Sequence, residues 1–209
     1  MDHLGLLEGE VDAMTAAVAA ADPDALIPAC PGWTVRDLVT HLVAVHVWAR
    51  AALKTATPPP YDERVLGPDL AEEYAGASQA LVAQLRELPG EHPCWTFDKT
   101  NRTASFWQRR QLHEVAVHRW DVSPYPLTDE IALDGIDEVI RFFAPRQVSL
   151  GRTTLPTGSL HLEAAGRDWQ VGVGDPTETL TGEPTDVLVR LWRRGAPLPG
   201  AWAQVQLAP

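Results

Sequence analysis

One segment of the chain carries a polar stripe between apolar flanks, and this combination restricts how the chain can fold. The segment runs from Ser105 to Asp121, and within it Glu114 and His118 lie four residues apart. On a helix, that spacing projects both side chains from one face. If the stripe faced water, its apolar flanks would be only half buried, and if it faced inward, its charges would need partners, because an unpaired buried carboxylate is costly. The segment therefore predicts a bundle helix whose polar face meets groups from elsewhere in the chain.

A second helical segment, residues 34–54, supplies a histidine that suits this stripe. It is strongly apolar, and His41 lies roughly 140° from the centre of its polar face, so we expect His41 to point into the bundle. Two imidazoles and one carboxylate, from His41, His118 and Glu114, form a three-ligand set for a divalent metal and leave coordination positions open for chemistry. Asp37, one turn before His41, is expected to orient the imidazole of His41.

Each of these features also has a more ordinary interpretation. A buried histidine such as His41 is more often a hydrogen-bonded core residue than a ligand, and a Glu114–His118 pair is more often a surface pair worth a few tenths of a kcal/mol. His46 falls on a flank of its helix and is a poorer ligand candidate. His113 and Glu114 do not begin an HExxH protease motif, because His113 and His118 are five residues apart and do not share a helix face.

The composition excludes several classes of protein. With 209 residues, 45% of them hydrophobic and 22% charged, the chain resembles an ordinary globular protein of one large domain or two small ones. Its formal net charge of −11 argues against a nucleic-acid partner or an anionic membrane surface. No run reaches the roughly 18 apolar residues of a membrane span, and the N-terminus has no secretory signal pattern. We therefore expect a cytoplasmic protein that is a monomer or a homodimer.

Two cysteines and two arginines stay open in their interpretation. Cys30 and Cys94 each lie beside a proline in a predicted loop, and neither has a Cys or His partner at a spacing of known type. One disulfide between them is not excluded, and we assign them no role. Arg109 and Arg110 suit an anionic substrate about as well as they suit a solvated helix flank.

Hydrophobic periodicity predicts an α+β chain with a helical bundle in residues 1–150. Helices are expected at 4–21, 34–54, 69–88, 105–121 and 135–147. Thr34–Asp37 and Ser105–Gln108 resemble capping boxes at two of the starts. We expect an up-down bundle with antiparallel neighbours.

The pattern changes in residues 151–209, which predict a small α+β domain. Strands are expected at 159–165, 169–173, 178–181 and 201–207, with a short helix at 184–194. A hairpin turn begins at Ala165–Gly166.

Several of these residues occur in the order found in a known family. The matching segments are Cys30–Pro31–Gly32–Trp33 with His41, Phe106–Trp107 through Arg110, and His113–Glu114 through His118 to Asp121. They resemble the mycothiol-dependent maleylpyruvate isomerase family of the DinB-like superfamily. Residues 180–192 resemble the C-terminal domain that often accompanies it, although Glu183–Pro184 departs from the commoner pattern.

This resemblance implies a DinB-like bundle that binds zinc, or another divalent metal, through His41, Glu114 and His118. It also implies a low-molecular-weight thiol cosubstrate, which is mycothiol in actinobacteria. A free thiol has a pKa of about 8.5, and coordination to the metal would make it a thiolate. Such a thiolate would isomerise a small electrophilic substrate or be transferred to it, and Arg110 is expected to hold a substrate carboxylate. A metal hydrolase that activates water, or a non-catalytic ligand-binding member, remains the alternative.

Overall fold

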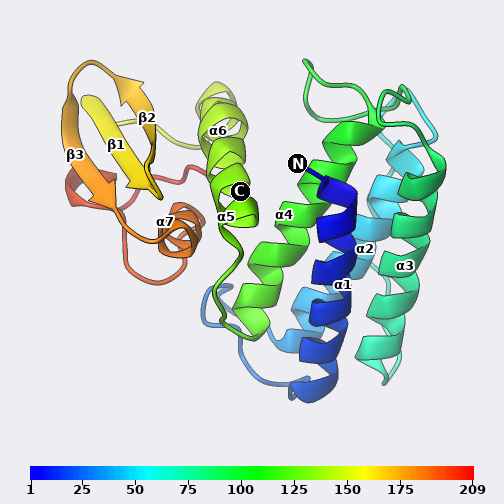
Figure 1. The fold of residues 1–209 in the computed structure, drawn as a ribbon. Coiled ribbons are helices and arrows are strands. Elements are labelled where there is room, and N and C mark those ends of the chain that lie inside the picture. The colour runs from blue at the N-terminus through cyan, green and yellow to red at the C-terminus, as the bar shows by residue number, and fades with distance from the viewer. The chain divides into compact units, whose positions relative to one another are not determined.

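The computed structural model describes residues 1–209, and the chain divides into two compact units, Met1–Tyr125 and Pro126–Pro209. The first unit is helical, and the second combines helices with a small sheet (Figure 1). An N-terminal helical bundle followed by an α+β region is the fold class predicted from the sequence.

Four helices form the first unit: α1 (His3–Ala20), α2 (Val35–Ala52), α3 (Leu70–Glu87) and α4 (Ala104–Val122). α1 packs against α3 and α4, and α2 packs against the same two helices. Their inner faces carry fully buried leucines, among them Leu7, Leu38, Leu42 and Leu112. Burial of each such side chain contributes about 1.5–3 kcal/mol, so packing of these faces accounts for most of the stability of the helices.

α2 and α3 run in the same direction, which differs from the expected antiparallel neighbours (Figure 1). Near their starts, Arg36 donates a hydrogen bond to the carbonyl of Gly67, and near their ends Gln84 donates to the carbonyl of Arg50. The connection 53–69 therefore returns along the length of the bundle and is called the crossover below. A long crossover of this kind permits a parallel pair within a four-helix bundle.

The two expected capping boxes have different outcomes. At α2, the Thr34 hydroxyl accepts from the Asp37 amide at 3.3 Å and the Asp37 carboxylate accepts from the Thr34 amide at 2.8 Å, so this box is confirmed. At α4, Thr103 precedes the first helical residue and makes no side-chain cap, so the box expected at Ser105–Gln108 is wrong. The Ser105 hydroxyl instead lies 2.8 Å from that of Thr103.

The second unit begins with α5 (Asp129–Glu138), a π-helical segment (Val139–Phe143) and α6 (Ala144–Ser149). A three-stranded sheet and a last helix follow: β1 (Gly158–Ala164), β2 (Arg167–Val173), β3 (Pro176–Thr181) and α7 (Pro184–Leu191). The strand order is β2-β1-β3, with β1 antiparallel to β2 and parallel to β3. Ala165 and Gly166 both have positive φ, which is the two-residue turn that suits a tight hairpin.

Two expectations for this part of the chain differ from the structure. The helix expected at 135–147 was placed in the bundle, but α5 packs against α7, and the second compact unit begins at Pro126. The strand expected at 201–207 is wrong, because Gly200–Trp202 is a short 3-10 helix and no ladder follows it. Trp202, Val205 and Leu207 are buried, so this apolar pattern reflects burial of single side chains and not a strand.

None of the helices has both the length and the apolar character that a membrane crossing requires.

Candidate metal centre

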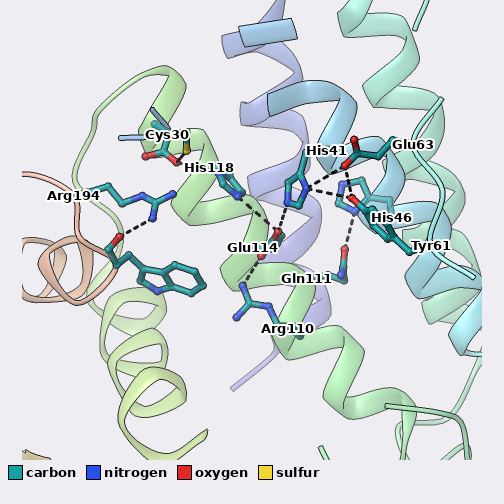
Figure 2. Close-up of polar contacts among 12 residues, drawn as sticks. Cys30, His41, His46, Tyr61, Glu63, Arg110, Gln111, Glu114, His118 and Arg194 are labelled. Carbon is teal, nitrogen blue, oxygen red and sulfur yellow. Dashed lines mark hydrogen bonds and ion pairs between the residues drawn. The ribbon is translucent and has the colours of Figure 1, made fainter. Parts of the chain in front are cut away.

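The three residues predicted as metal ligands lie together in the first unit (Figure 2). His41 comes from α2, and Glu114 and His118 come from adjacent turns of α4. The Oε1 atom of Glu114 lies 3.0 Å from Nε2 of His41 and 3.7 Å from Nε2 of His118. One donor atom from each residue lies within 4.8 Å of the others. The pairing of two distant segments that the helix faces predicted is therefore present.

The donor atoms fit the coordination of a divalent metal. Zinc binds imidazole nitrogen and carboxylate oxygen at about 2.0–2.2 Å, which in a tetrahedral site places neighbouring donor atoms about 3.3 Å apart. The two separations from Glu114 Oε1, 3.0 and 3.7 Å, lie on either side of that value. Three ligands also leave a fourth position for a water or a cosubstrate.

His118 is oriented by a buried carboxylate of its own helix. Its Nδ1 atom lies 2.9 Å from Oδ2 of Asp121, whose side chain is fully buried. An ionised carboxylate only accepts hydrogen bonds, so Nδ1 carries the proton and Nε2 presents its lone pair toward Glu114. This carboxylate–histidine arrangement is typical of metal-binding imidazoles.

His41 has different neighbours from those expected. The Asp37 carboxylate belongs to the cap of α2, so its predicted contact with His41 is wrong. Instead, the Tyr61 hydroxyl of the crossover lies 3.3 Å from Nδ1 of His41 and donates a 2.8 Å hydrogen bond to Glu63. The Trp33 ring lies 5.2 Å from the His41 ring.

Arg110 contacts the remaining oxygen of the shared carboxylate. Its Nη2 atom lies 2.8 Å from Oε2 of Glu114, and the Arg110 side chain is only 4% exposed. Arg110 thereby leaves Oε1 of Glu114 to face the two imidazoles. Its predicted contact with a substrate carboxylate stays a prediction.

The electrostatics of the site favour a cation between the donor atoms. Burial acts to raise the pKa of Glu114, but the hydrogen bond with His41 and the nearby charges, Arg110 foremost, hold that pKa well below its usual range. Burial acts to lower the pKa of His41, but the hydrogen bond and charge of Glu114 outweigh it and raise that pKa. Glu114 accepts across this 3.0 Å contact when Nε2 of His41 carries a proton, and a metal ion between the two atoms would take the place of that proton.

Cys30 is a neighbour of the site that sequence reasoning left without a role. Its Sγ atom lies 3.8 Å from Oδ2 of Asp121, and Cys30, His118 and Asp121 form a second group of donors within 4.8 Å. Two sequence signals bear on this position: Cys30 precedes the helix of His41, and it begins one of the segments that resemble the family. Cys94 is buried elsewhere, and burial raises the pKa of its thiol to about 11. Neither cysteine forms a disulfide, so the bridge left open in the sequence is absent.

His46 lies beyond His41 on α2 and belongs to neither donor group. It is fully buried, and its Nδ1 atom lies 2.7 Å from Oε1 of Gln111. Burial lowers its pKa to about 4 despite that hydrogen bond. His46 is therefore a neutral core residue.

A four-helix bundle with a cluster of two imidazoles and one carboxylate, followed by a small α+β unit, is the class of protein that the fold and the site define. Residues 4–123 match the family model described as the mycothiol maleylpyruvate isomerase N-terminal domain, and the chain belongs to that family. The resemblance drawn from the sequence is thereby confirmed.

The fold is also similar to crystal structures of the mycothiol-dependent maleylpyruvate isomerase. A mutant form of that protein matches with a TM-score of 0.71 and 16% identity, over 99% of this chain and 95% of that chain. A second structure matches with a TM-score of 0.66 and 15% identity over the same shares. At such low identity the likeness shows the fold alone. No curated protein sequence matches the chain.

Proposed function

We propose that this chain is a divalent-metal-dependent enzyme that activates a low-molecular-weight thiol for isomerisation of, or transfer to, a small electrophilic substrate. The observation that carries the proposal is the convergence of Nε2 of His41, Nε2 of His118 and Oε1 of Glu114. Zinc is the metal we favour, because two imidazoles and a carboxylate are ligands that zinc takes in catalytic sites. Mycothiol is the thiol we favour, since the family and the similar crystal structures are described by it.

The residues of the chain would hold the reactants in place. His41, Glu114 and His118 would bind the metal, and Asp121 would orient His118. Arg110 would hold the Glu114 carboxylate in one orientation. The His41 side chain is 23% exposed, so a cosubstrate can approach from its side of the site.

A bound metal would lower the pKa of a coordinated thiol. A free thiol has a pKa of about 8.5 and is mostly protonated at neutral pH. For a cis-enoyl diacid, the thiol sulfur would add to one carbon of the double bond. The carbon–carbon bond, now single, would then rotate. Elimination would then release the sulfur and leave the trans isomer. With another electrophile of this kind, the neighbouring carbon would take up a proton in place of elimination and the sulfur would remain bonded to carbon, which is transfer. Family membership supports this reaction class over water activation or ligand binding without turnover.

Metal content and thiol dependence test the proposal together. In wild-type protein we expect about one equivalent of zinc and turnover of maleylpyruvate that requires mycothiol and is abolished by a chelator. Glu114→Ala and His41→Ala should lose both the metal and the turnover. His161→Ala, which changes a half-buried histidine of the second unit, is the matched control and should retain both. Stoichiometric zinc in Glu114→Ala, or turnover indifferent to thiol and chelator, would overturn the proposal.

A further inference from the structure

We propose that Tyr61 and Glu63, on the crossover between α2 and α3, are positioning residues that hold His41 in the orientation required for metal binding. Neither residue was singled out in the sequence, and neither belongs to the donor groups around the site. The inference rests on the proposed metal centre. In this proposal, residues of the crossover determine how tightly that centre binds its metal.

The direction of the hydrogen bonds follows from the single proton of a tyrosine hydroxyl. Glu63 accepts from the Tyr61 hydroxyl at 2.8 Å, and an ionised carboxylate has no proton to return. The Tyr61 oxygen, 3.3 Å from Nδ1 of His41, is therefore the acceptor in that second contact. Nδ1 of His41 must then carry the proton.

This tautomer presents the correct nitrogen to the metal. With Nδ1 protonated, loss of the other ring proton leaves the lone pair of His41 on Nε2, the atom that lies 3.0 Å from Glu114. Asp121 has the same effect on His118, where Nδ1 is also the outer nitrogen. Each imidazole of the site thus has an oxygen acceptor on its outer side, and such partners are worth roughly 10- to 100-fold in metal affinity.

The residues that orient the two imidazoles differ in their exposure to solvent. The Asp121 side chain is fully buried on the helix that carries His118. Tyr61 is 46% exposed, and the Glu63 side chain is 49% exposed. His41 therefore depends on a partner that solvent competes for, and we expect it to be the more weakly held ligand.

The position of Tyr61 is itself fixed by contacts from α2. The Trp48 indole donates a 3.1 Å hydrogen bond to the carbonyl of Pro59. The Trp48 ring also meets the Tyr61 ring edge-on, at 6.0 Å between centroids. Trp48 lies two helical turns after His41, on the same side of α2. One helix thus carries both the candidate ligand and the anchor of the segment that orients it.

Zinc affinity of single and double variants tests the inference. Tyr61→Phe keeps the ring against Trp48 and removes the acceptor, so we expect the zinc Kd, measured by competition with a chromogenic chelator, to rise about tenfold or more. Glu63→Gln should raise the Kd less, because the amide oxygen still accepts from Tyr61. Since Glu63 acts through Tyr61, the effect of Glu63→Gln should largely disappear in the Tyr61→Phe background.

Tyr125→Phe is the matched control, because its hydroxyl also donates to a glutamate, Glu10, but contacts no candidate ligand. It should leave the zinc Kd unchanged, and the metal-free Tyr61→Phe protein should unfold at the wild-type temperature. Absence of zinc binding in wild type would refute the proposed function itself. Wild-type zinc binding with an unchanged Kd in Tyr61→Phe, or additive effects in the double variant, would refute only the role of the crossover. If Tyr61→Phe loses its helical structure, the zinc Kd of Glu63→Gln, a change at an exposed position, tests the role of the crossover instead.

Discussion

Three histidines of the first unit show how the surroundings of an imidazole decide what it can do. His41 and His118 each have an outer nitrogen held by an oxygen acceptor and an inner nitrogen turned toward the Glu114 carboxylate. His46 is bonded to the neutral amide of Gln111, and its other nitrogen is buried. The hydrogen bond and charge of Glu114 raise the pKa of His41, whereas burial lowers the pKa of His46 and keeps His46 neutral.

The neutral state of His46 predicts a specific loss of stability in mild acid. Burial lowers its pKa from 6.5 to about 4, so between these values the unfolded chain takes up a proton that the folded chain does not. The free energy of unfolding should therefore decrease as the pH is lowered from 6.5 to 4, by up to about 3 kcal/mol from this group. His46→Asn removes the titrating group and keeps a donor for Gln111.

Urea unfolding of wild type and His46→Asn between pH 7.5 and 4 checks this expectation. The variant should be less stable at pH 7.5, because the smaller side chain leaves a cavity. Its stability should then decline less steeply than that of wild type as the pH falls. Parallel curves for the two proteins would show that His46 does not control this part of the pH dependence.

The sequence predicted that His41, Glu114 and His118 converge, as they do in the structure, but not which residues orient them. Glu114 and His118 share a helix face through local geometry alone, and the apolar character of the second segment directed His41 inward. The pairing of His118 with Asp121 has a local signal too, because the two are one helical turn apart. Tyr61 and Glu63 have none, since their approach to His41 depends on the path of the crossover through space.

At the scale of elements, a buried ion pair joins α1 to α4. Nε and Nη2 of Arg119 lie 2.7 and 3.0 Å from the two carboxylate oxygens of Glu10, and Tyr125 donates to the same carboxylate at 2.7 Å. The Glu10 side chain is 10% exposed and that of Arg119 is 14% exposed. Such a pair stabilises the folded protein no more than well-packed apolar residues of similar volume would. Removal of one partner, however, leaves the other charge buried and unpaired.

Glu10→Gln should therefore destabilise the first unit by roughly 3 kcal/mol, as measured by urea unfolding at pH 7. The matched control is Glu8→Gln, which removes an ion pair with Arg86 whose side chain is 62% exposed. Exposed pairs contribute about 0–1 kcal/mol, so this variant should unfold almost as wild type does. Equal losses in the two variants would indicate that the Glu10–Arg119 pair is no more important than a surface pair.

Most of the elements that periodicity predicted well bury one continuous face, and α4, which is buried on nearly all sides, is the exception. All four bundle helices and the three strands of the sheet are close to their expected bounds, because the period of 3.6 or 2 in apolar residues follows directly from burial. Residues 201–207 alternate in the same way without forming a strand, since strand formation also requires a partner edge that the sequence does not show. The parallel direction of α2 and α3 likewise depends on the route of a long connection.

At the scale of the whole molecule, the change in architecture expected from the sequence and the division into compact units fall at different residues. The change was expected at residue 150, where helices give way to strands, whereas the compact units divide between Tyr125 and Pro126. Hydrophobic periodicity predicts that α5 is amphipathic, but it does not show which neighbour covers the apolar face of that helix. That neighbour is α7, which comes more than 40 residues later in the chain.

Asp137, in the last turn of α5, is a polar link within the second unit. Its Oδ1 atom accepts a 2.7 Å hydrogen bond from the Trp169 indole, and its Oδ2 atom lies 2.7 Å from Nη2 of Arg167. Burial acts to raise the pKa of Asp137, but the hydrogen bonds from Trp169 and Arg167 outweigh it and hold that pKa below 3.8. The ionised carboxylate therefore ties the end of α5 to β2 at neutral pH.

Because the folded-state pKa of Asp137 is depressed, its stabilising effect is fully present above pH 3.8 and is lost as the pH falls through the folded value. Asp137→Asn should reduce the stability of the second unit by about 1–3 kcal/mol at pH 6, and the difference from wild type should shrink as the pH falls below 3.8. Amide hydrogen exchange locates the effect: it should accelerate in β1 and β2 and remain at wild-type rates in α1 to α4. Asp168→Asn, at an exposed position of β2, is the control and should change neither region. Acceleration of equal size in α1 to α4 would mean that the two compact units open together, because only a shared unfolding event would carry a defect at Asp137 into the helices of the first unit.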